Sequence, residues 1–437
     1  PYSSGREASG LLHLVGILAA LYDDDVGALM LDEPEVSLHP QLQAFLLNEI
    51  ISAAGHYSEG GFKKIIVMAT HSTEMLNILK VDDLQSLIFC HDLGTPPVQI
   101  DPSAGELQNR KIQALVTRLG QEHKLSLFCR RPLLVEGPSD RLICSFLSKK
   151  LELHLEAAGS QILPVIGKGQ MSVVSKFFRL LGKTPVVLAD ADAFADSSEL
   201  TNYFLADCTE ADQKASTLGA QSAISIATAV YSDFCNLALN NWFDISQNAM
   251  QHPYWVNKGE GDDIQAKRRS AFCTLFNINA SDLMALPNNT QWIAIKHRIE
   301  TVLDLLEIAG CFILRKGAIE SYYQSSDVFT SEGKPSAAVD EIEFLESLPS
   351  TQLESLVPEI IRYIKFASLS EKINEADSLR DILLSVAAPA MSRLNAGTNT
   401  QELKILCKTI LRERSEIFDL SVEGEKLTIS INSNILN

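Results

Sequence analysis

The chain has 437 residues, of which 46% are hydrophobic and 21% charged, a balance that excludes a largely disordered protein. At about 150 residues per domain, this length allows about three domains. The formal net charge of −18 excludes a protein that coats nucleic acid over its whole surface, although a local nucleic-acid site remains compatible with it.

No segment of the sequence indicates a membrane anchor or a signal peptide. The longest apolar stretch, Gly10 to Tyr22, is too short to span a bilayer and contains His13. The eight cysteines are scattered without a CxxC pair, which predicts reduced and mostly buried thiols in a cytoplasmic protein. Because the chain starts at Pro1 rather than at a methionine, we expect further sequence upstream.

The first part of the chain alternates helices with buried strands. Apolar spacing predicts a helix over 11–21, a strand over 27–31, a helix over 40–53 and a strand over 63–69. This alternation is typical of a mostly parallel α/β sheet, in which ligands bind at the carboxyl ends of the strands. We expect residues 1–110 to form one domain.

A second α/β unit is expected over residues 126–335. Its predicted strands cover 133–135, 162–166, 185–188 and 311–314, and helices open at Pro138 and Met171. Residues 197–298 have few strand signals and are predicted to form a helical insertion. Residues 336–437 are acidic and predicted to be helical, with a strand over 426–431.

Acidic residues end the first predicted strand in the sequence LMLDEP, which has the form of a Walker B motif. Asp32 would hold the Mg²⁺ shell, and Glu33 would polarise the attacking water. His71 follows the next strand, where ABC-type ATPases carry a histidine that senses the γ-phosphate. Ser4 and Gly5 precede a helix and resemble the ABC signature motif, which binds the ATP of a partner subunit.

The loop that cradles the nucleotide phosphates is missing from this sequence. No G-x-x-x-x-G-K-[ST] occurs in the chain, and Gly167-Lys168-Gly169 does not have the required spacing. We therefore expect this chain alone to bind ATP weakly. ATPase activity, which uses ATP together with Mg²⁺, is expected only in the full-length assembly.

A second set of acidic residues follows the strands of the second unit. Glu136 and Asp140 lie four residues apart across a strand-to-helix turn, so both can face one point. Asp190 and Asp192 would point the same way in extended chain. Carboxylates this close require cations, and a set of oxygen ligands favours Mg²⁺ or Mn²⁺ over zinc.

This pattern resembles the Toprim domain of topoisomerases, primases and certain nucleases. The resemblance makes Glu136 the Toprim glutamate and Asp190 with Asp192 its DxD pair, and it implies two metals that activate water and stabilise the leaving oxygen. The expected fold is therefore α/β, with the C-terminal part of an ABC-type ATPase followed by a Rossmann-like Toprim domain with a parallel sheet.

An ABC-type ATPase followed by a Toprim domain resembles the overcoming-lysogenization-defect (OLD) family of nucleases, which has relatives in phage-defence systems such as Gabija and some retrons. The sequence LDEPEVSLHP also resembles the Walker B region of that family. The resemblance implies a DNA endonuclease that depends on Mg²⁺ or Mn²⁺, is coupled to the ATPase and acts in antiviral defence.

The family resemblance also supplies further candidate residues. Lys316 fits a lysine that follows a late Toprim strand and would neutralise charge on the scissile phosphate. Glu320 is a candidate to support the metal or Lys316. The family has one more acidic ligand, for which Asp282, Glu300 and Asp304 all stay open. Asp140 stands where relatives often have glutamate.

Two alternative functions stay open. The chain could be another Toprim enzyme, such as a primase or topoisomerase, or an ATP-dependent DNA-binding or sensor subunit without nuclease turnover. Because a signature motif acts in trans, the resemblance implies a homodimer or higher oligomer, and some relatives pair with a helicase-like or reverse-transcriptase partner.

Residues 126–200 contain nine basic and eight acidic residues, so bound divalent cations would leave this region positive and suited to DNA.

Overall fold

The computed structural model describes residues 9–56, 58, 63–91, 95–103, 105–165, 169–325, 333–368, 375–394, 397–412, 415, 418–423 and 426–431. The chain forms two compact units, Pro1–Leu369 and Ser370–Asn437. The first unit contains two parallel sheets, and the α/β class expected from the sequence is confirmed.

The first sheet is a parallel pair of strands with helices on one face. In chain order the elements are α1 (Ser9–Leu21), β1 (Ala28–Asp32), α2 (Pro40–Ala53) and β2 (Ile65–Ala69), with Asp32 opposite Ala69. Helix α2 begins after His39, whose side chain accepts a hydrogen bond from the Gln41 amide. The two helices bury an apolar core against one face of the strands, whereas Met30 on the other face is 87% exposed.

A series of short elements connects the two sheets. They are η3 (Thr73–Met75), η4 (Val81–Ser86), β3 (Ile88–Phe89), β4 (Val98–Gln99), η5 (Gly105–Gln108), α3 (Arg110–Val116) and α4 (Gln121–Ser126). Leu76, Leu84 and Ile112 share a core with the second sheet. The core of the second sheet therefore includes residues well before the boundary that we expected at residue 110.

The second sheet has four parallel strands in the order β6-β5-β7-β8. They are β5 (Arg131–Val135), β6 (Ser160–Pro164), β7 (Val186–Ala189) and β8 (Cys311–Ile313), with helices α5 (Pro138–Lys150) and α6 (Met171–Leu180) between the first three. Both faces are covered, because Leu134 and Val187 enter one core while Leu133 and Val186 enter the other. Burial on both faces explains why these strands read as continuous apolar runs.

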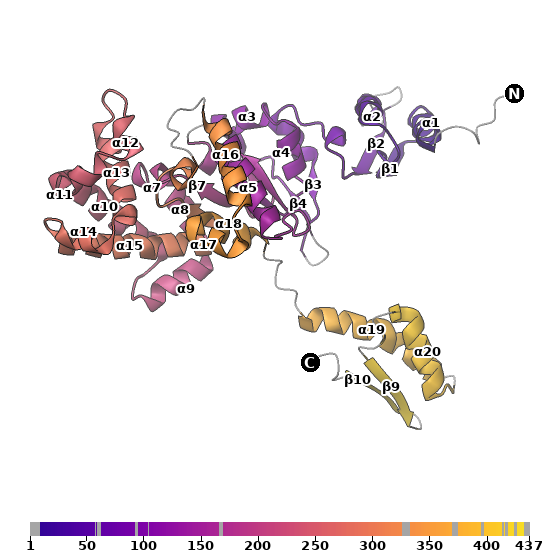
Figure 1. Cartoon of the computed structure of the whole chain (residues 1–437). Helices are drawn as coiled ribbons and strands as arrows, with labels where there is room; N and C mark the ends of the chain where they lie inside the picture. Colours follow the sequence, from indigo (N-terminus) through magenta and orange to yellow (C-terminus); the bar gives the residue numbers. More distant parts are fainter. Residues whose placement is uncertain are drawn as a thin grey trace. The chain divides into compact units, whose positions relative to one another are not determined.

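The expected insertion is present between β7 and β8, and every described element in it is a helix (Figure 1). Phe194, Phe234, Phe272 and Trp292 are fully buried within its core. The helices are α7 (Asp192–Ala195), α8 (Glu199–Leu205), α9 (Thr209–Thr217), α10 (Ala223–Asn240), α11 (Trp242–Ala249), α12 (Pro253–Val256), α13 (Asp263–Asn277), α14 (Ala280–Ala285) and α15 (Asn289–Ile308).

The segment after β8 returns to the sheet. It contains η6 (Ile319–Tyr322), α16 (Lys334–Glu346), α17 (Ser350–Leu356) and α18 (Pro358–Ser368). Ile360 and Tyr363 of α18 pack in the core on one face of the sheet, and the Tyr363 hydroxyl donates to the Leu134 carbonyl at 3.4 Å. The domain boundary that we expected at residue 336 therefore differs from the structure, in which the first unit ends at Leu369 because α18 covers the sheet.

The second unit is small and has its own core. It contains α19 (Glu375–Leu394), α20 (Thr400–Leu411), β9 (Phe418–Glu423) and β10 (Lys426–Ile431). The strand expected over 426–431 is present as β10, and it pairs antiparallel with β9, which the sequence reading did not predict. Val386, Leu403 and Leu420 form the centre of the core.

All eight cysteines are free thiols, and six of them are buried, as the sequence predicted. Among the residues that the structure describes, none of the helices has the length and apolar character needed to cross a bilayer.

Candidate metal centre and nucleotide site

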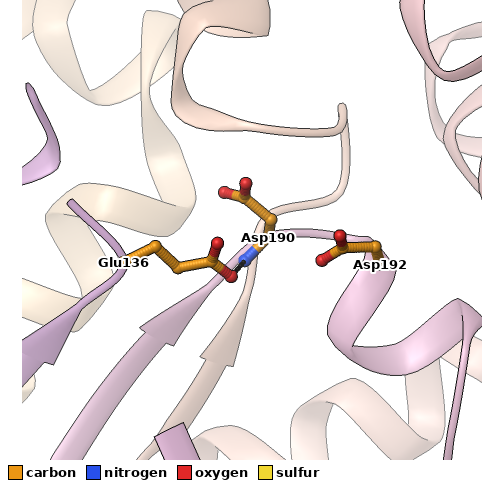
Figure 2. A group of neighbouring side chains, drawn as sticks. All are labelled: Glu136, Asp190 and Asp192. Carbon is orange, nitrogen blue, oxygen red and sulfur yellow. Dashed lines mark hydrogen bonds between the residues drawn. The ribbon is translucent and has the colours of Figure 1, made fainter. Parts of the chain in front are cut away.

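Three carboxylates meet at the carboxyl ends of the neighbouring strands β5 and β7. One side-chain oxygen from each of Glu136, Asp190 and Asp192 lies within 4.8 Å of the others (Figure 2). The Asp190 amide donates to Glu136 Oε1 at 3.0 Å and so fixes the orientation of that carboxylate. All three residues are half-buried. Three oxygen ligands converging in this way suit a hard divalent cation.

Asp192 reaches this group through a turn. We expected Asp190 and Asp192 to point the same way in extended chain, but the strand ends at Ala189 and Asp192 is the first residue of α7. The Ala191 amide between them donates to the Gly317 carbonyl at 3.0 Å, which ties this turn to the loop after β8.

Asp140 lies beside the group rather than in it. Its side chain accepts a hydrogen bond from the Gly137 amide at 2.7 Å, and the residue is only 8% exposed. It therefore caps the first turn of α5 and holds the turn that follows Glu136.

Burial and mutual repulsion disfavour the charged forms of these acids. Burial, together with the charges of Glu320 and Glu136, raises the pKa of Asp140 to about 7. Burial and the neighbouring carboxylates also raise the pKa of Glu136 and hold that of Asp190 well above its usual range. These shifts favour the protonated forms when no cation is bound, and a bound cation would compete with the protons.

Lys334 is a cation of this site that sequence reasoning missed. Its ammonium lies 2.9 Å from the Glu320 carboxylate, whose side chain is only 8% exposed. Burial lowers the pKa of Lys334, but Glu320, Asp190 and Asp140 together raise it. Lys334 opens α16 after Gly333 and before a proline, so its position at the start of a helix was a signal that could have been used.

Lys316 has different surroundings. Its ammonium lies 4.9 Å from the centre of the Tyr322 ring, and the Tyr322 hydroxyl accepts hydrogen bonds from the Arg315 and Lys316 amides. In the described part of the chain no ion pair joins Lys316 to a carboxylate, and its catalytic role stays a prediction. Glu320 lies close enough to the site for its charge to raise the pKa values of Asp140 and Asp190.

The candidates for one more acidic ligand do not join the three-carboxylate group of the described residues. The group contains none of Asp282, Glu300 and Asp304. Asp304 instead lies 4.0 Å from the Arg315 guanidinium.

The residues that the sequence predicts for the ATPase site lie together at the ends of β1 and β2. Asp32 ends β1, the Glu33 amide donates to the Ala69 carbonyl at 2.9 Å, and the His71 ring lies 3.6 Å from the Glu33 carboxylate. The His71 and Glu33 side chains are 82% and 49% exposed. Glu35, which was not foreseen, accepts hydrogen bonds from the Thr70 hydroxyl and the His71 amide.

Two predicted phosphate contacts cannot be placed. Ser4 and Gly5 lie outside the described residues, as do Gly167 and Lys168.

Comparison with known proteins assigns a family to each of the two sheets. Residues 127–192 match the family model described as "Overcoming lysogenization defect protein-like, TOPRIM domain". Residues 3–77 match the family model described as "AAA domain, putative AbiEii toxin, Type IV TA system". The first match spans Glu136, Asp190 and Asp192, and the second spans Asp32, Glu33 and His71.

One curated relative spans part of the same region. Endonuclease GajA of Bacillus cereus (strain VD045) is 23% identical over 152 residues, which cover 33% of this chain and 23% of that protein. The chain thus spans about a quarter of the length of the relative that it matches. With an AAA-type ATPase region followed by an OLD-like Toprim domain, the chain resembles the overcoming-lysogenization-defect family of ATPase–Toprim proteins.

Proposed function

We propose that this protein is a DNA endonuclease that uses Mg²⁺ or Mn²⁺ at its Toprim site. The observation that carries the proposal is the convergence of the Glu136, Asp190 and Asp192 oxygens within 4.8 Å at one edge of a parallel sheet. The name of the relative, an endonuclease, supports the same chemistry.

The donor set fits divalent cations, because it consists of carboxylate oxygens that repel one another when unneutralised. Glu136, Asp190 and Asp192 would hold the first ion, and Asp140 and Glu320 would support a second. When bound, the ions supply an activated water and stabilise the leaving oxygen.

Other residues of the chain would orient the carboxylates and balance the charge of the substrate. Asp140 holds the backbone after Glu136 through the Gly137 amide, which keeps the Glu136 carboxylate aimed at the site. Lys334 places a positive charge beside Glu320, where it would offset the charge of a phosphodiester. Lys316 stays the candidate that the family resemblance proposes for the same role.

We also propose that the AAA region controls cleavage with ATP and Mg²⁺. Asp32, Glu33 and His71 would act on the nucleotide, and Ser4 and Gly5 would contact the ATP of a partner subunit, which implies a homodimer or higher oligomer. A cytoplasmic role in antiviral defence, with a helicase-like or reverse-transcriptase partner, follows from the family resemblance.

A plasmid-nicking assay tests the nuclease. We expect the protein to nick or cleave supercoiled DNA with Mn²⁺ or Mg²⁺, to stop when EDTA is added, and to lose the activity in Glu136→Ala. Glu156→Ala removes an exposed glutamate of the same domain and serves as the matched control. Equal cleavage by Glu136→Ala and wild type would remove the Toprim site from the mechanism. DNA binding without any metal-dependent product would favour the sensor alternative.

A further inference from the structure

A cavity of about 260 Å³ lies beside the carboxylates, between the insertion and the segment after β8. Tyr254, Lys258 and Arg269 line it from the insertion, and Glu320, Ser321 and Lys334 line it from the opposite side. Glu320 and Lys334 are also the ion pair of the carboxylate site. The cavity therefore neighbours the proposed metal centre through Glu320 and Lys334, while Glu136, Asp190 and Asp192 do not line it.

The insertion contributes positive charge to this cavity. Lys258 pairs with Asp263 and lies 3.8 Å from the centre of the Trp255 ring, while Arg269 forms a two-bond ion pair with Asp196. Asp263 and Asp196 do not line the cavity, but Asp262 of the insertion and Glu320 do, so its lysine, arginine and carboxylate lining consists of three basic and two acidic side chains. An ammonium has three N–H donors and a guanidinium five, so both side chains retain donors for a further anion.

Tyr254 supplies a second observation that points to a ligand. Its hydroxyl is buried and has no hydrogen-bond partner among the described residues. Tyr254 also lines the cavity, and its hydroxyl has Asp190 and Asp192 as electrostatic neighbours, so this residue lies close to both the cavity and the carboxylates. Because a buried hydroxyl without a partner is unfavourable, the arrangement favours an acceptor oxygen arriving from outside the chain.

We propose that this cavity binds a backbone phosphate of the DNA strand, next to the phosphate that is cleaved at the carboxylates. The Tyr254 hydroxyl and the Lys258 ammonium donate to the phosphate oxygens, and Arg269 adds charge from the side. This inference rests on the proposed nuclease function, and it implies that the insertion holds the DNA strand in position for cleavage.

The dimensions and surroundings favour a phosphate that belongs to a strand. The volume greatly exceeds the roughly 30 Å³ share of one water molecule, so a phosphate with part of its sugar can enter. The cavity shares Glu320 and Lys334 with the cleavage site, so a strand whose phosphate lies at the carboxylates brings its neighbouring phosphate to this wall.

Equilibrium binding separates this inference from cleavage. A fluorescein-labelled DNA oligonucleotide is titrated with the full chain in Ca²⁺, and anisotropy is recorded at several salt concentrations. We expect Lys258→Ala to weaken binding by about threefold to tenfold and to reduce the salt slope by about one ion. We expect Tyr254→Phe, which removes one oxygen atom, to weaken binding by a smaller factor without changing the slope. Lys214→Ala removes an exposed lysine on α9 of the same insertion and should match wild type.

Each outcome has a defined meaning. If wild type cleaves DNA with Mn²⁺ but both variants bind like wild type, the phosphate site is wrong and the nuclease stands. If the variants weaken binding but wild type yields no product, the phosphate site stands and the nuclease is wrong. If wild type neither binds nor cleaves, both are wrong. Displacement of the oligonucleotide by an equal concentration of thymidine monophosphate would assign the cavity to a free nucleotide and overturn the inference.

Discussion

Acidic residues follow a parallel strand at two places in this protein, and the two places differ in their surroundings. At the end of β1, Glu33 is 49% exposed and its neighbour His71 is 82% exposed. At the end of β7, Asp190 lies among Glu136, Asp192 and Asp140, and burial and repulsion hold its pKa well above its usual range.

The difference arises from what covers each sheet. The strands β1 and β2 have helices on one face, and the other face is open in the described part of the chain. The strands β5 and β7 have apolar cores on both faces, and the segment after β8 places Glu320 and Lys334 beside the acids. The Toprim carboxylates are thus poised to take up cations, whereas the acids after β1 are largely solvated.

A cleavage assay without ATP is the strongest test of this difference between the acids after β1 and the acids after β7. We expect Asp190→Asn to reduce Mn²⁺-dependent cleavage by about a hundredfold or more, because it removes a carboxylate of the proposed metal centre. Asp32→Asn makes the same chemical change at the other site and should leave ATP-free cleavage close to wild type. Product would be measured as nicked plasmid over time, and equal losses in the two variants would contradict the contrast.

A smaller effect distinguishes the two lysines near the site. We expect Lys334→Ala to reduce cleavage by roughly tenfold to a hundredfold, because its ammonium lies beside Glu320 and the carboxylates. Lys316→Ala should cost less, because its ammonium lies over the Tyr322 ring. Initial rates at saturating Mn²⁺ would decide between them. A larger loss in Lys316→Ala would return the role to the lysine that the family resemblance indicated.

The pH dependence of metal binding sharpens the contrast further. Since the pKa of Asp140 is raised to about 7, its protons compete with a cation below that pH and are gone above it. Mn²⁺ at about 100 times its Kd should therefore stabilise the protein by about 2.7 kcal/mol near pH 8, and by clearly less near pH 6. Thermal unfolding with and without Mn²⁺ measures this difference, and Glu136→Gln should abolish it. A shift in Tm that does not depend on pH would argue against proton displacement.

The smallest expected effect concerns stability without metal. The pKa of Asp140 is higher in the folded protein than in the unfolded chain. The folded protein therefore becomes less stable as the pH rises from near 4, the ordinary pKa of this group, to about 7. Asp140→Asn keeps an acceptor for the Gly137 amide and removes the ionised form that burial disfavours, so it should raise the free energy of unfolding near pH 7. The gain should vanish near pH 4. Urea denaturation in EDTA would measure it, with Asp32→Asn as a control expected to change little at either pH.

Strands and helices that are strongly apolar could be placed from sequence. Parallel strands covered on both faces read as apolar runs, so the run before Glu136 and the run before Asp190 located β5 and β7 within a few residues. The acids that follow these runs predicted a metal site, and the structure brings Glu136, Asp190 and Asp192 together because the carboxyl ends of parallel strands share one edge of the sheet.

Other features depend on contacts that sequence patterns do not encode. Lys334 opens a helix far along the chain from Asp192, and its pairing with Glu320 exists only after α16 has packed. The apolar face of α18 has the spacing of any amphipathic helix, so nothing in it specified that Tyr363 would pack on the sheet and extend the unit to Leu369. Asp192 was correctly grouped with Asp190, although a turn and not extended chain brings them together.

The pairing of β7 with β8 has a consequence for how the protein reaches its native state. Val187 lies opposite Cys311, so the whole insertion separates these two adjacent positions along the chain. Contacts between such distant residues carry a large entropic cost of loop closure and form late. We expect a nascent chain to assemble β5, β6 and β7 with their carboxylates first, and to add Glu320 and Lys334 only when β8 docks. The protein would then acquire its charge-balancing lysine as one of the last steps of folding, after its acidic residues are already in place.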